Sequence, residues 1–401
     1  MKKTTGGITA PVGFTAAGIH SGIKSSPSLD LALIVSNVEG PMAGVFTSNK
    51  IPAAPVILDR LHLKTRRGRA IIINSGNANA CTGHQGLHDA EEMARLVANR
   101  LQVDATSVFV GSTGVIGPKL PMHAIRQSIP LLMQNLKKSG HRDAARAIMT
   151  TDTTIKEIAV QTQIGKQRVK IGGMAKGSGM IHPDMATMLA YVTTDVVIHP
   201  TTLQTFLQKS VDRSFNAISV DGETSTNDTV LCLANGLANN SMIDGSSTGA
   251  KKFLDALNDL CDSLARKICQ DGEGATKIVE LVVGGARNHR EAKIIANTLA
   301  TSPLIKTALF GEDPNWGRFI AAIGRSSVPI QPHHIGLSFG GIPIVRNGEE
   351  VLPSTERQIQ RVMRRKHYTI TVKVGNGKGW AKIWTTDFSY DYVKINASYR
   401  S

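Results

Sequence analysis

Three segments of the chain carry hydrophobic residues at the spacing of one helix face: "HDAEEMARLVANRLQ" from His88, "TTLQTFLQKSVDRSF" from Thr201 and "KKFLDALNDLCDSLARKICQ" from Lys251. In the last of them, Phe253 and Leu257 begin a series of apolar residues that recur every three or four positions. This period is that of an amphipathic helix. We therefore expect three helices, each packed by its apolar face on a sheet.

Other stretches have the pattern of strands. "SVFVGSTGVIG", from Ser107, follows the first predicted helix and runs into a glycine turn, and "MLAYVTTD", from Met188, has the composition of a buried strand. Near the end, "YTITVKV", from Tyr368, alternates apolar and polar residues and turns through residues 375–379 into "WAKIW". The last pattern predicts a β-hairpin.

Helices that alternate with strands predict an α/β protein with α+β layers. At 401 residues and 41% hydrophobic content the chain can form two or three cores. No repeat or low-complexity linker marks a boundary. We place one near residue 285, which gives a catalytic region of residues 1–285 and a C-terminal α+β domain of residues 286–401.

The charge is strongly positive, with 46 Lys and Arg against 31 Asp and Glu, a net charge of +15. The densest basic clusters are "KTRRGR" and "RVMRRK". This charge raises nucleic acid as a partner. Aromatic residues make up only 4% of the chain, however, and no stacking or helix-turn-helix pattern accompanies the charge. We expect solvated basic faces, or a general attraction to anionic metabolites, and no nucleic-acid partner; a basic nucleic-acid-binding protein stays the third alternative.

The N-terminal "MKKTTGGITAPVGF" lacks the apolar run of a signal peptide, and runs such as "AIII" are too short to span a bilayer. We expect a soluble cytoplasmic protein without a membrane partner.

Two motifs resemble metal or cofactor sites, but each lacks a feature that such a site needs. His84 and His88 lie four residues apart, but "HQGLH" lacks the glutamate of a zinc protease motif, and Gly86 weakens the helix that would align them. "GNGKG" has strands on both sides, so we interpret it as a turn and not a phosphate loop. We expect no metal and no cofactor. The four cysteines show no CxxC spacing, which predicts buried thiols: Cys81, Cys232, Cys261 and Cys269.

Six polar turns rich in glycine, threonine and asparagine separate the periodic segments: "NSGNANACTG" (74–83), "GSTGVIG" (111–117), "TTDTT" (150–154), "DGETSTNDT" (221–229), "DGEGATK" (271–277) and "GEDPNWGR" (311–318). Turn chemistry explains each of them singly. Together they suit the walls of a polar cavity for a small zwitterion and an oxyanion.

In the stretch "KGSGMIHPDMATMLAYVTTD" (176–195), a glycine-rich loop runs into a predicted strand with Thr187 at the junction. If the chain is cut before Thr187, its own α-amine, with a reference pKa of about 7.7 to 8.0, can serve as the base for its hydroxyl. Before the cut, the same hydroxyl could attack the carbonyl of Ala186 and form an ester that water releases. The simpler interpretation is a routine strand residue, which the spacing alone favours.

Several of these motifs, together with the terminal "NASYRS", closely resemble the glutamate N-acetyltransferase (ornithine acetyltransferase, ArgJ) family of arginine biosynthesis: "KGSGMIHPDMATMLAYVTTD", "NSGNANACTG", "STGVIG", "DGETSTNDT" and "GEDPNWGR". The resemblance runs from Gly6 to Ser401. It implies a sandwich of the ArgJ/DmpA-like N-terminal-nucleophile type, in which sheets pack between helical layers, with a smaller C-terminal domain.

The resemblance also implies the reaction. The chain would cleave its own bond between Ala186 and Thr187, and the α chain (1–186) and β chain (187–401) would stay together, typically as an α2β2 heterotetramer. Thr187 would take the acetyl group from N-acetylornithine, release ornithine and pass the acetyl group to glutamate in a ping-pong exchange. Whether acetyl-CoA is a second donor, as in bifunctional members, stays open.

Individual roles carry over from the family motifs. Thr113 would donate its hydroxyl, and Gly114 its backbone N–H, to the oxyanion. The positions that match substrate-binding residues are Thr153, Lys176, Thr187, Glu273, Asn396 and Ser401. A lysine suits the α-carboxylate of an amino acid, and a carboxylate suits its amine. In the tail, we expect three β-prone residues to anchor the segment that carries Asn396: Tyr392, Val393 and Ile395.

The sequence departs from the family pattern at Tyr191, where we expect phenylalanine, and at Glu223, where we expect aspartate. The terminal Ser401 stands where threonine is also common. None of these changes touches Thr187. The alternative function is a related amidase or aminopeptidase of the N-terminal-nucleophile group, in which water accepts the acyl group.

Overall fold

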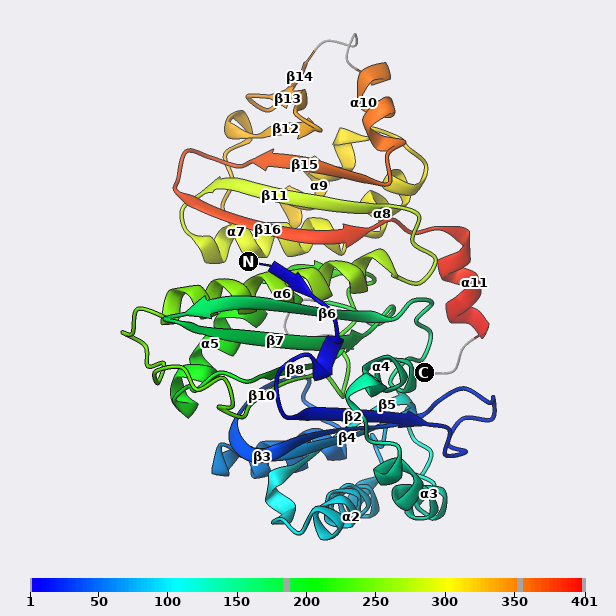
Figure 1. Cartoon of the computed structure of the whole chain (residues 1–401). Coiled ribbons are helices and arrows are strands. Elements are labelled where there is room, and N and C mark those ends of the chain that lie inside the picture. The colour runs from blue at the N-terminus through cyan, green and yellow to red at the C-terminus, as the bar shows by residue number, and fades with distance from the viewer. Residues whose placement is uncertain (1, 183–187, 352–355, 399–401) are drawn as a thin grey trace.

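A computed structural model describes residues 2–182, 188–351 and 356–398 of the protein. Ala186, Thr187 and Ser401 therefore lie outside the described residues. Figure 1 shows the helices and strands in stacked layers; the second sheet described below lies at one end, and helix α11 (Tyr390–Ser398) returns along the side toward the first sheet. Within the described residues, no helix is both long and apolar enough to cross a membrane.

Nine of the described strands form one sheet in the order β1-β6-β7-β8-β10-β3-β4-β5, with β2 paired to β3. Strand β3 is bent where its register with β4 shifts, between Val35 and Gly40. Before the bend, residues 31–36 pair with β2, and after it residues 42–46 pair with β10. The strands are β1 (Lys2–Thr4), β2 (Phe14–Ile19), β3 (Leu31–Phe46), β4 (Arg67–Asn77), β5 (Val108–Val115), β6 (Lys156–Ile164), β7 (Gln167–Lys176), β8 (Leu189–Thr194) and β10 (Thr229–Ala234).

The bend divides this sheet into two halves that share a buried core. Ile71 and Phe109 from one half and Met174 and Leu189 from the other belong to the same hydrophobic cluster. Side chains of a short helix, α4 (His141–Ala147), complete this cluster. The two halves therefore form a sandwich.

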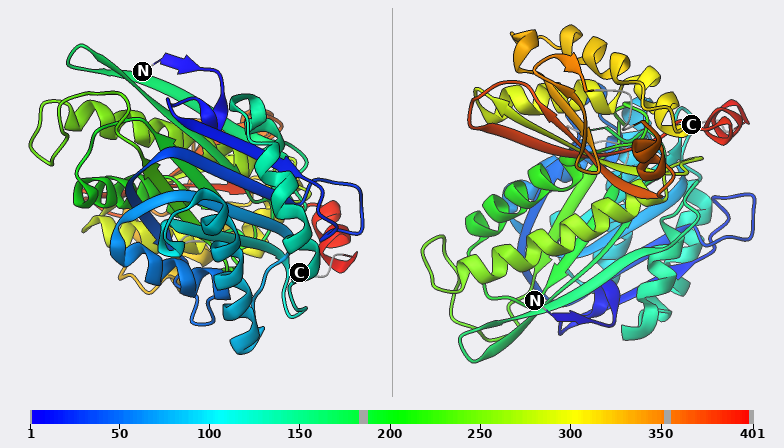
Figure 2. Two further views of the ribbon diagram at one scale, coloured as in Figure 1. Left: turned by 60° about the horizontal axis from the view of Figure 1, so that its bottom comes forward. Right: turned by 90° about the horizontal axis from the view of Figure 1, so that it is seen from above.

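Helices cover both outer faces of the sandwich (Figures 1 and 2). On the half formed by β2, β3, β4 and β5, a second core includes α2 and α3, and on the other half a third core includes α5 and α6. The order helix, sheet, sheet, helix confirms the predicted layered α/β sandwich. The three helices expected from periodicity are confirmed as α2, α5 and α6. The covering helices are α1 (Ala54–His62), α2 (Gly83–Leu101), α3 (Met122–Gln134), α5 (Pro200–Arg213) and α6 (Ala250–Gln270).

A second sheet, of seven described strands, has the order β14-β13-β12-β15-β11-β16-β9 and its own hydrophobic core. The boundary that we expect near residue 285 falls inside β11, so the division into two domains stays a prediction. Its elements are β9 (Ile218–Ser219), β11 (Ile278–Ala286), α7 (His289–Ala300), α8 (Pro303–Phe310), α9 (Trp316–Arg325), β12 (Gly336–Phe339), β13 (Ile342–Arg346), β14 (Glu349–Glu350), α10 (Glu356–Met363), β15 (His367–Lys373) and β16 (Gly379–Thr386).

The predicted hairpin is wrong, although both of its strands are present. Strand β11 lies between them, parallel to β15 and antiparallel to β16. The connecting loop crosses the end of β11, where the N–H of Gly377 donates to the carbonyl of Gly285 at 2.9 Å. A Cβ on Gly377 would lie only 2.0 Å from the carbonyl oxygen of Ala286. The "GNGKG" turn is thus rich in glycine because it passes close to another backbone.

The tail is helical and not extended. Helix α11 (Tyr390–Ser398) follows Ser389, whose hydroxyl accepts the N–H of Tyr392 at 3.3 Å. Asp391 stands in the first turn, where a negative charge favours a helix. No residue of this helix is buried, and the Tyr392 ring stacks on Phe388 with centroids 4.6 Å apart. Local capping therefore outweighs the β-propensity on which our prediction of the tail rests.

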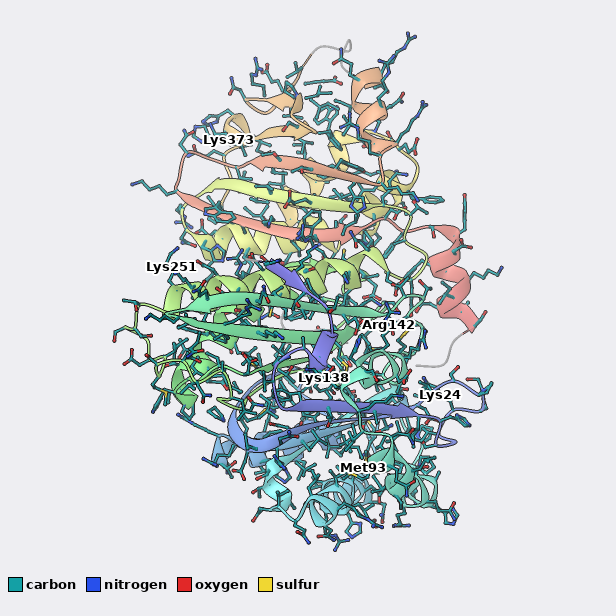
Figure 3. All side chains as sticks on the ribbon, in the orientation of Figure 1. Lys24, Met93, Lys138, Arg142, Lys251 and Lys373 are labelled. Atoms are coloured by element: carbon teal, nitrogen blue, oxygen red, sulfur yellow. The ribbon has the colours of Figure 1, made fainter. Side chains whose placement is uncertain are left out.

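The cysteines are mostly buried, and the basic side chains are spread over the molecule. Three cysteines are buried as predicted, but Cys81 is exposed, so the prediction is wrong at this position. Figure 3 shows that basic side chains lie on separate parts of the molecule, among them Lys251 on α6 and Lys373 on β15.

Candidate active site

A cavity of about 240 Å³ lies where loops of the first sheet meet helix α11. Five of the six polar turns singled out in the sequence contribute to it, whereas "GEDPNWGR" lines a separate depression. The described residues that line the cavity are Ala78, Thr113, Gly114, Ile116, Thr150, Thr151, Lys176, Gly179, Met180, Asp221, Glu223, Ser225, Asn227, Glu273, Tyr392 and Asn396.

The structure brings most of the described candidate residues together here. Those that line the cavity are Thr113, Gly114, Lys176, Glu273 and Asn396. Thr153 is not among the lining residues, and its backbone N–H and hydroxyl both donate to the carboxylate of Asp271. Its role in substrate binding stays a prediction, as do the roles of Thr187 and Ser401.

Thr113 and Gly114 lie near the end of strand β5 and line the cavity. Gly114 has a φ of +133°, and a Cβ on it would lie 2.3 Å from the carbonyl carbon of Gly76 in β4. Only glycine fits this conformation and this approach. Thr113 is 3% exposed, and no described residue hydrogen-bonds its hydroxyl. Two consecutive residues with hydrogen-bond donors, Thr113 and Gly114, therefore border the cavity where the backbone is held fixed.

Strand β7 ends with Lys176, which is 3% exposed. Its Nζ donates to the Thr150 hydroxyl at 2.7 Å and lies 3.7 Å from Oδ2 of Asp152. Burial lowers the pKa of Lys176, and the charge of Asp152 opposes this shift. Thr150 and Asp152 therefore hold the Lys176 ammonium in a fixed direction at the cavity wall.

Behind Lys176 lies a buried ion-pair network. Lys156 Nζ contacts the carboxylates of Asp152 at 2.6 Å and Asp271 at 2.5 Å. Burial alone would raise the pKa of Asp152, but the charges of Lys176 and Lys156 and the N–H of Gly177 hold that pKa below its ordinary value. A buried charge is tolerated when it is paired and hydrogen-bonded in this way. The network connects Lys176 to the loop that carries Thr153.

Glu273 faces the cavity from the loop after α6 and is 8% exposed. Its carboxylate accepts from Nδ2 of Asn396 at 3.0 Å, and a Cβ on Gly179 would lie 2.4 Å from the same carboxylate. Gly179 therefore leaves room for the Glu273 side chain, and α11 is held to the site through Asn396.

Asp221 holds the loop that follows Gly179. Its two carboxylate oxygens accept the N–H groups of Met180 at 2.5 Å, Ile181 at 2.8 Å and Glu223 at 3.2 Å. Burial raises the pKa of Asp221 to about 6, although these three hydrogen bonds oppose the shift. A carboxyl group that titrates near neutral pH thus stands at the cavity wall.

The described residues on either side of residues 183–187 are both tied to this region. Met180 lines the cavity, and Leu189, the first residue of β8, is the register partner of Lys176. The N–H of Met188 donates to Oδ1 of Asp228 at 2.9 Å. Burial raises the pKa of Asp228 well above its ordinary value, and no described residue bonds its other oxygen.

The metal-ligand cluster among the described residues lies elsewhere, at His88, Asp89 and Glu92 on α2. Arg126 already binds both oxygens of Glu92, at 2.6 and 2.7 Å. This carboxylate is therefore paired, and we assign no metal site to the cluster.

Several of the site residues were not anticipated from sequence. Asp152 and Lys156 lie within or next to "TTDTT", and Asp221 begins "DGETSTNDT", so the turn motifs point to them only as turn residues. The spacing of Asp152 and Lys156, four residues apart, is the sequence signal for an ion pair, but it does not reveal that both side chains are buried. Chemically, the described lining residues offer a hydroxyl without a hydrogen-bond partner, one ammonium and carboxylates, which are groups that suit a small amino acid and an acyl-transfer step.

Comparisons with known proteins agree on one family. A family model described as the ArgJ family matches residues 15–401. The chain is 46% identical over 408 residues to "Arginine biosynthesis bifunctional protein ArgJ 1" of Nostoc sp., covering 99% of this chain and 98% of that protein. It is 47% identical over 403 residues to "Arginine biosynthesis bifunctional protein ArgJ" of Symbiobacterium thermophilum, covering 100% of both.

A solved structure is similar as well. The crystal structure of arginine biosynthesis bifunctional protein argJ from Bacillus halodurans is 40% identical, with a TM-score of 0.50 over 52% of this chain and 98% of that chain.

Proposed function

The chain belongs to the ArgJ family of arginine biosynthesis, and on that premise we propose that it transfers the acetyl group of N-acetylornithine to glutamate through an acetyl ester on Thr187. The products are ornithine and N-acetylglutamate. The protein works in the cytoplasm, and its two self-cleaved chains assemble as an α2β2 heterotetramer.

Maturation comes first in this proposal. The Thr187 hydroxyl attacks the carbonyl carbon of Ala186, the peptide C–N bond breaks, and the amide nitrogen takes up the hydroxyl proton. Water then hydrolyses the ester, which leaves the Ala186 carboxylate and a Thr187 with a free amine and a free hydroxyl. One residue then holds both the nucleophile and its base.

Acetyl transfer uses the same residue. The Thr187 amine accepts the hydroxyl proton while the oxygen attacks the acetyl carbonyl of N-acetylornithine. The Thr113 hydroxyl and the Gly114 N–H donate to the oxyanion that forms. As the C–N bond breaks, the proton passes to the leaving amine of ornithine. The amine of glutamate then attacks the acetyl ester, and the reverse proton transfers release N-acetylglutamate and restore Thr187.

Charged and polar residues of the cavity bind the two amino-acid substrates. Lys176 pairs with the α-carboxylate of either amino acid, and its network with Asp152 and Lys156 keeps the ammonium directed toward the cavity. Glu273 and Asn396 contact the substrate from the opposite chain fragment, and Thr153 and Ser401 complete the site.

One observation supports this proposal most. The two proposed oxyanion donors, Lys176, Glu273 and Asn396 come from four separate parts of the sequence and line one cavity. The residues on either side of 183–187 are tied to the same place, since Met180 lines it and Leu189 pairs in register with Lys176.

The test is an assay of the purified protein with N-acetylornithine, with and without glutamate, in which the products are identified by mass spectrometry. We expect N-acetylglutamate and ornithine in equal amounts, with ornithine release that depends on glutamate after the first turnover. Steady release of ornithine and acetate without glutamate would instead establish the amidase alternative. A parallel reaction with acetyl-CoA and glutamate decides whether the protein also uses that donor.

A further inference from the structure

The described residues that line the cavity carry more negative than positive charge, although the whole chain has a net charge of +15. Among the described residues that line it are three carboxylates, Asp221, Glu223 and Glu273, and one ammonium, Lys176. Lys176 can pair with only one substrate carboxylate. At least one described carboxylate therefore remains for a positive group of a ligand.

The three carboxylates differ in what already binds them. Both oxygens of Asp221 accept backbone N–H groups, from Met180, Ile181 and Glu223. Glu273 is buried and accepts from Asn396. Glu223 is exposed, and no described residue forms a hydrogen bond or an ion pair with its carboxylate. Its backbone is nevertheless fixed, because its N–H donates to Asp221.

On this basis, and resting on the function proposed above, we propose that Glu223 is a specificity-determining residue whose carboxylate receives the side-chain ammonium of ornithine and N-acetylornithine. A zwitterion with its α-carboxylate at Lys176 and a second positive group on its side chain satisfies both the Lys176 ammonium and the Glu223 carboxylate. Asp221, directly behind the backbone of Glu223, adds a second negative charge to the same wall.

The proposal has an opposite consequence for the acceptor. Glutamate carries a negative charge on its side chain, which Glu223 repels when the amino acid binds with its α-carboxylate at Lys176. The exposed Glu223 side chain can turn toward solvent and admit glutamate, at some loss of affinity. Glu223 thus favours the cationic donor over the anionic acceptor.

The decisive measurement is equilibrium binding, by calorimetry, of ornithine and of norvaline, which has the same carbon chain but no side-chain ammonium. Wild type should bind ornithine more tightly than norvaline. Glu223→Gln should lower the affinity for ornithine about fivefold, as expected for an exposed ion pair, and leave norvaline unchanged. Glu223→Asp keeps the charge and is the matched control, which should retain the preference for ornithine.

Steady-state kinetics gives a second readout that a merely structural role would not produce. Glu223→Gln should raise KM for N-acetylornithine and lower KM for glutamate, with self-cleavage intact. An equal loss for ornithine and norvaline, no loss for either, or a wild type that does not distinguish them would overturn the proposal. The binding result is independent of turnover, so a wild type that binds ornithine but makes no N-acetylglutamate would contradict the proposed function alone.

Discussion

At the scale of single residues, the neighbours Thr113 and Gly114 carry different kinds of constraint. Gly114 is fixed by its backbone, because its φ of +133° and the closeness of Gly76 exclude any side chain. Thr113 is free of such a constraint, and its hydroxyl has no hydrogen-bond partner among the described residues. Packing therefore does not explain why a hydroxyl stands at position 113, whereas the proposed oxyanion chemistry does.

Replacing Thr113 tests that role. Thr113→Val keeps the shape of the buried side chain and removes the hydroxyl, so kcat for acetyl transfer should fall about 10²- to 10³-fold, the effect of losing one oxyanion donor. Thr113→Ser retains the hydroxyl and should keep most of the activity. Self-cleavage of Thr113→Val should slow as well, because it also passes through an oxyanion. If valine and serine variants turn over equally fast, Thr113 has only a structural role.

Asp221 makes the stability of the protein depend on pH. Its pKa is about 6 in the folded protein against an ordinary value of 3.8. Between these values the folded protein keeps a proton that the unfolded chain has released, so this contribution is present below pH 3.8 and is lost as the pH rises toward 6.

The non-titrating variant Asp221→Asn removes this dependence. The free energy of unfolding of the variant, relative to wild type, should therefore rise between pH 4 and pH 7, by at most about 3 kcal/mol. Urea denaturation of both proteins at several pH values measures the difference. A difference that stays constant over this range would show that Asp221 does not titrate there.

At the scale of elements, local pattern predicts what an element is but not which element it pairs with. The apolar faces of α2, α5 and α6 follow from spacing alone, because burial against a sheet requires that period. The alternation in residues 368–374 also predicts β15. The position of β11 between β15 and β16 depends on contacts across about 90 to 110 residues of sequence, which no local pattern encodes.

The same limit applies to the site. Motifs identify Thr113, Gly114, Lys176, Glu273 and Asn396, because the family resemblance carries them. The ion pairs of Lys156 with Asp152 and Asp271 were not foreseen, since a charged residue in a polar turn is usually solvated. Only the fold shows that these charges are buried.

The crossing of the loop over β11 can be tested with two adjacent glycines. Gly285 has a φ of +85°, and a Cβ on it would lie 2.2 Å from the carbonyl oxygen of Gly375, whereas a Cβ on Gly284 meets nothing within 4 Å. Gly285→Ala should lower the free energy of unfolding by at least about 2 kcal/mol. Gly284→Ala should change it by less than about 1 kcal/mol. Equal effects of the two substitutions, measured by urea denaturation, would contradict the close crossing.

At the scale of the whole molecule, the two fragments that cleavage before Thr187 would produce are interleaved in one sheet. Strand β8 pairs with β7, and β10 pairs with β3, so strands from residues 1–186 flank strands from residues 187–401 on both sides. Hydrophobic side chains of both fragments share the same cores. The fragments should stay together in native buffer and separate only when the protein is denatured.

The central claim is that Thr187 becomes a free N-terminus and then carries the acetyl group. It is tested most directly by denaturing mass spectrometry after incubation with N-acetylornithine in the absence of glutamate, with Thr187→Ala as the control. Dividing the 42.9 kDa chain at residue 187 gives fragments of about 20 and about 23 kDa. We predict that the larger begins at Thr187 and gains one acetyl group, which glutamate then removes, while the variant stays uncut and unlabelled. An active enzyme with an intact chain, or an acetyl group on any other residue, would contradict the account.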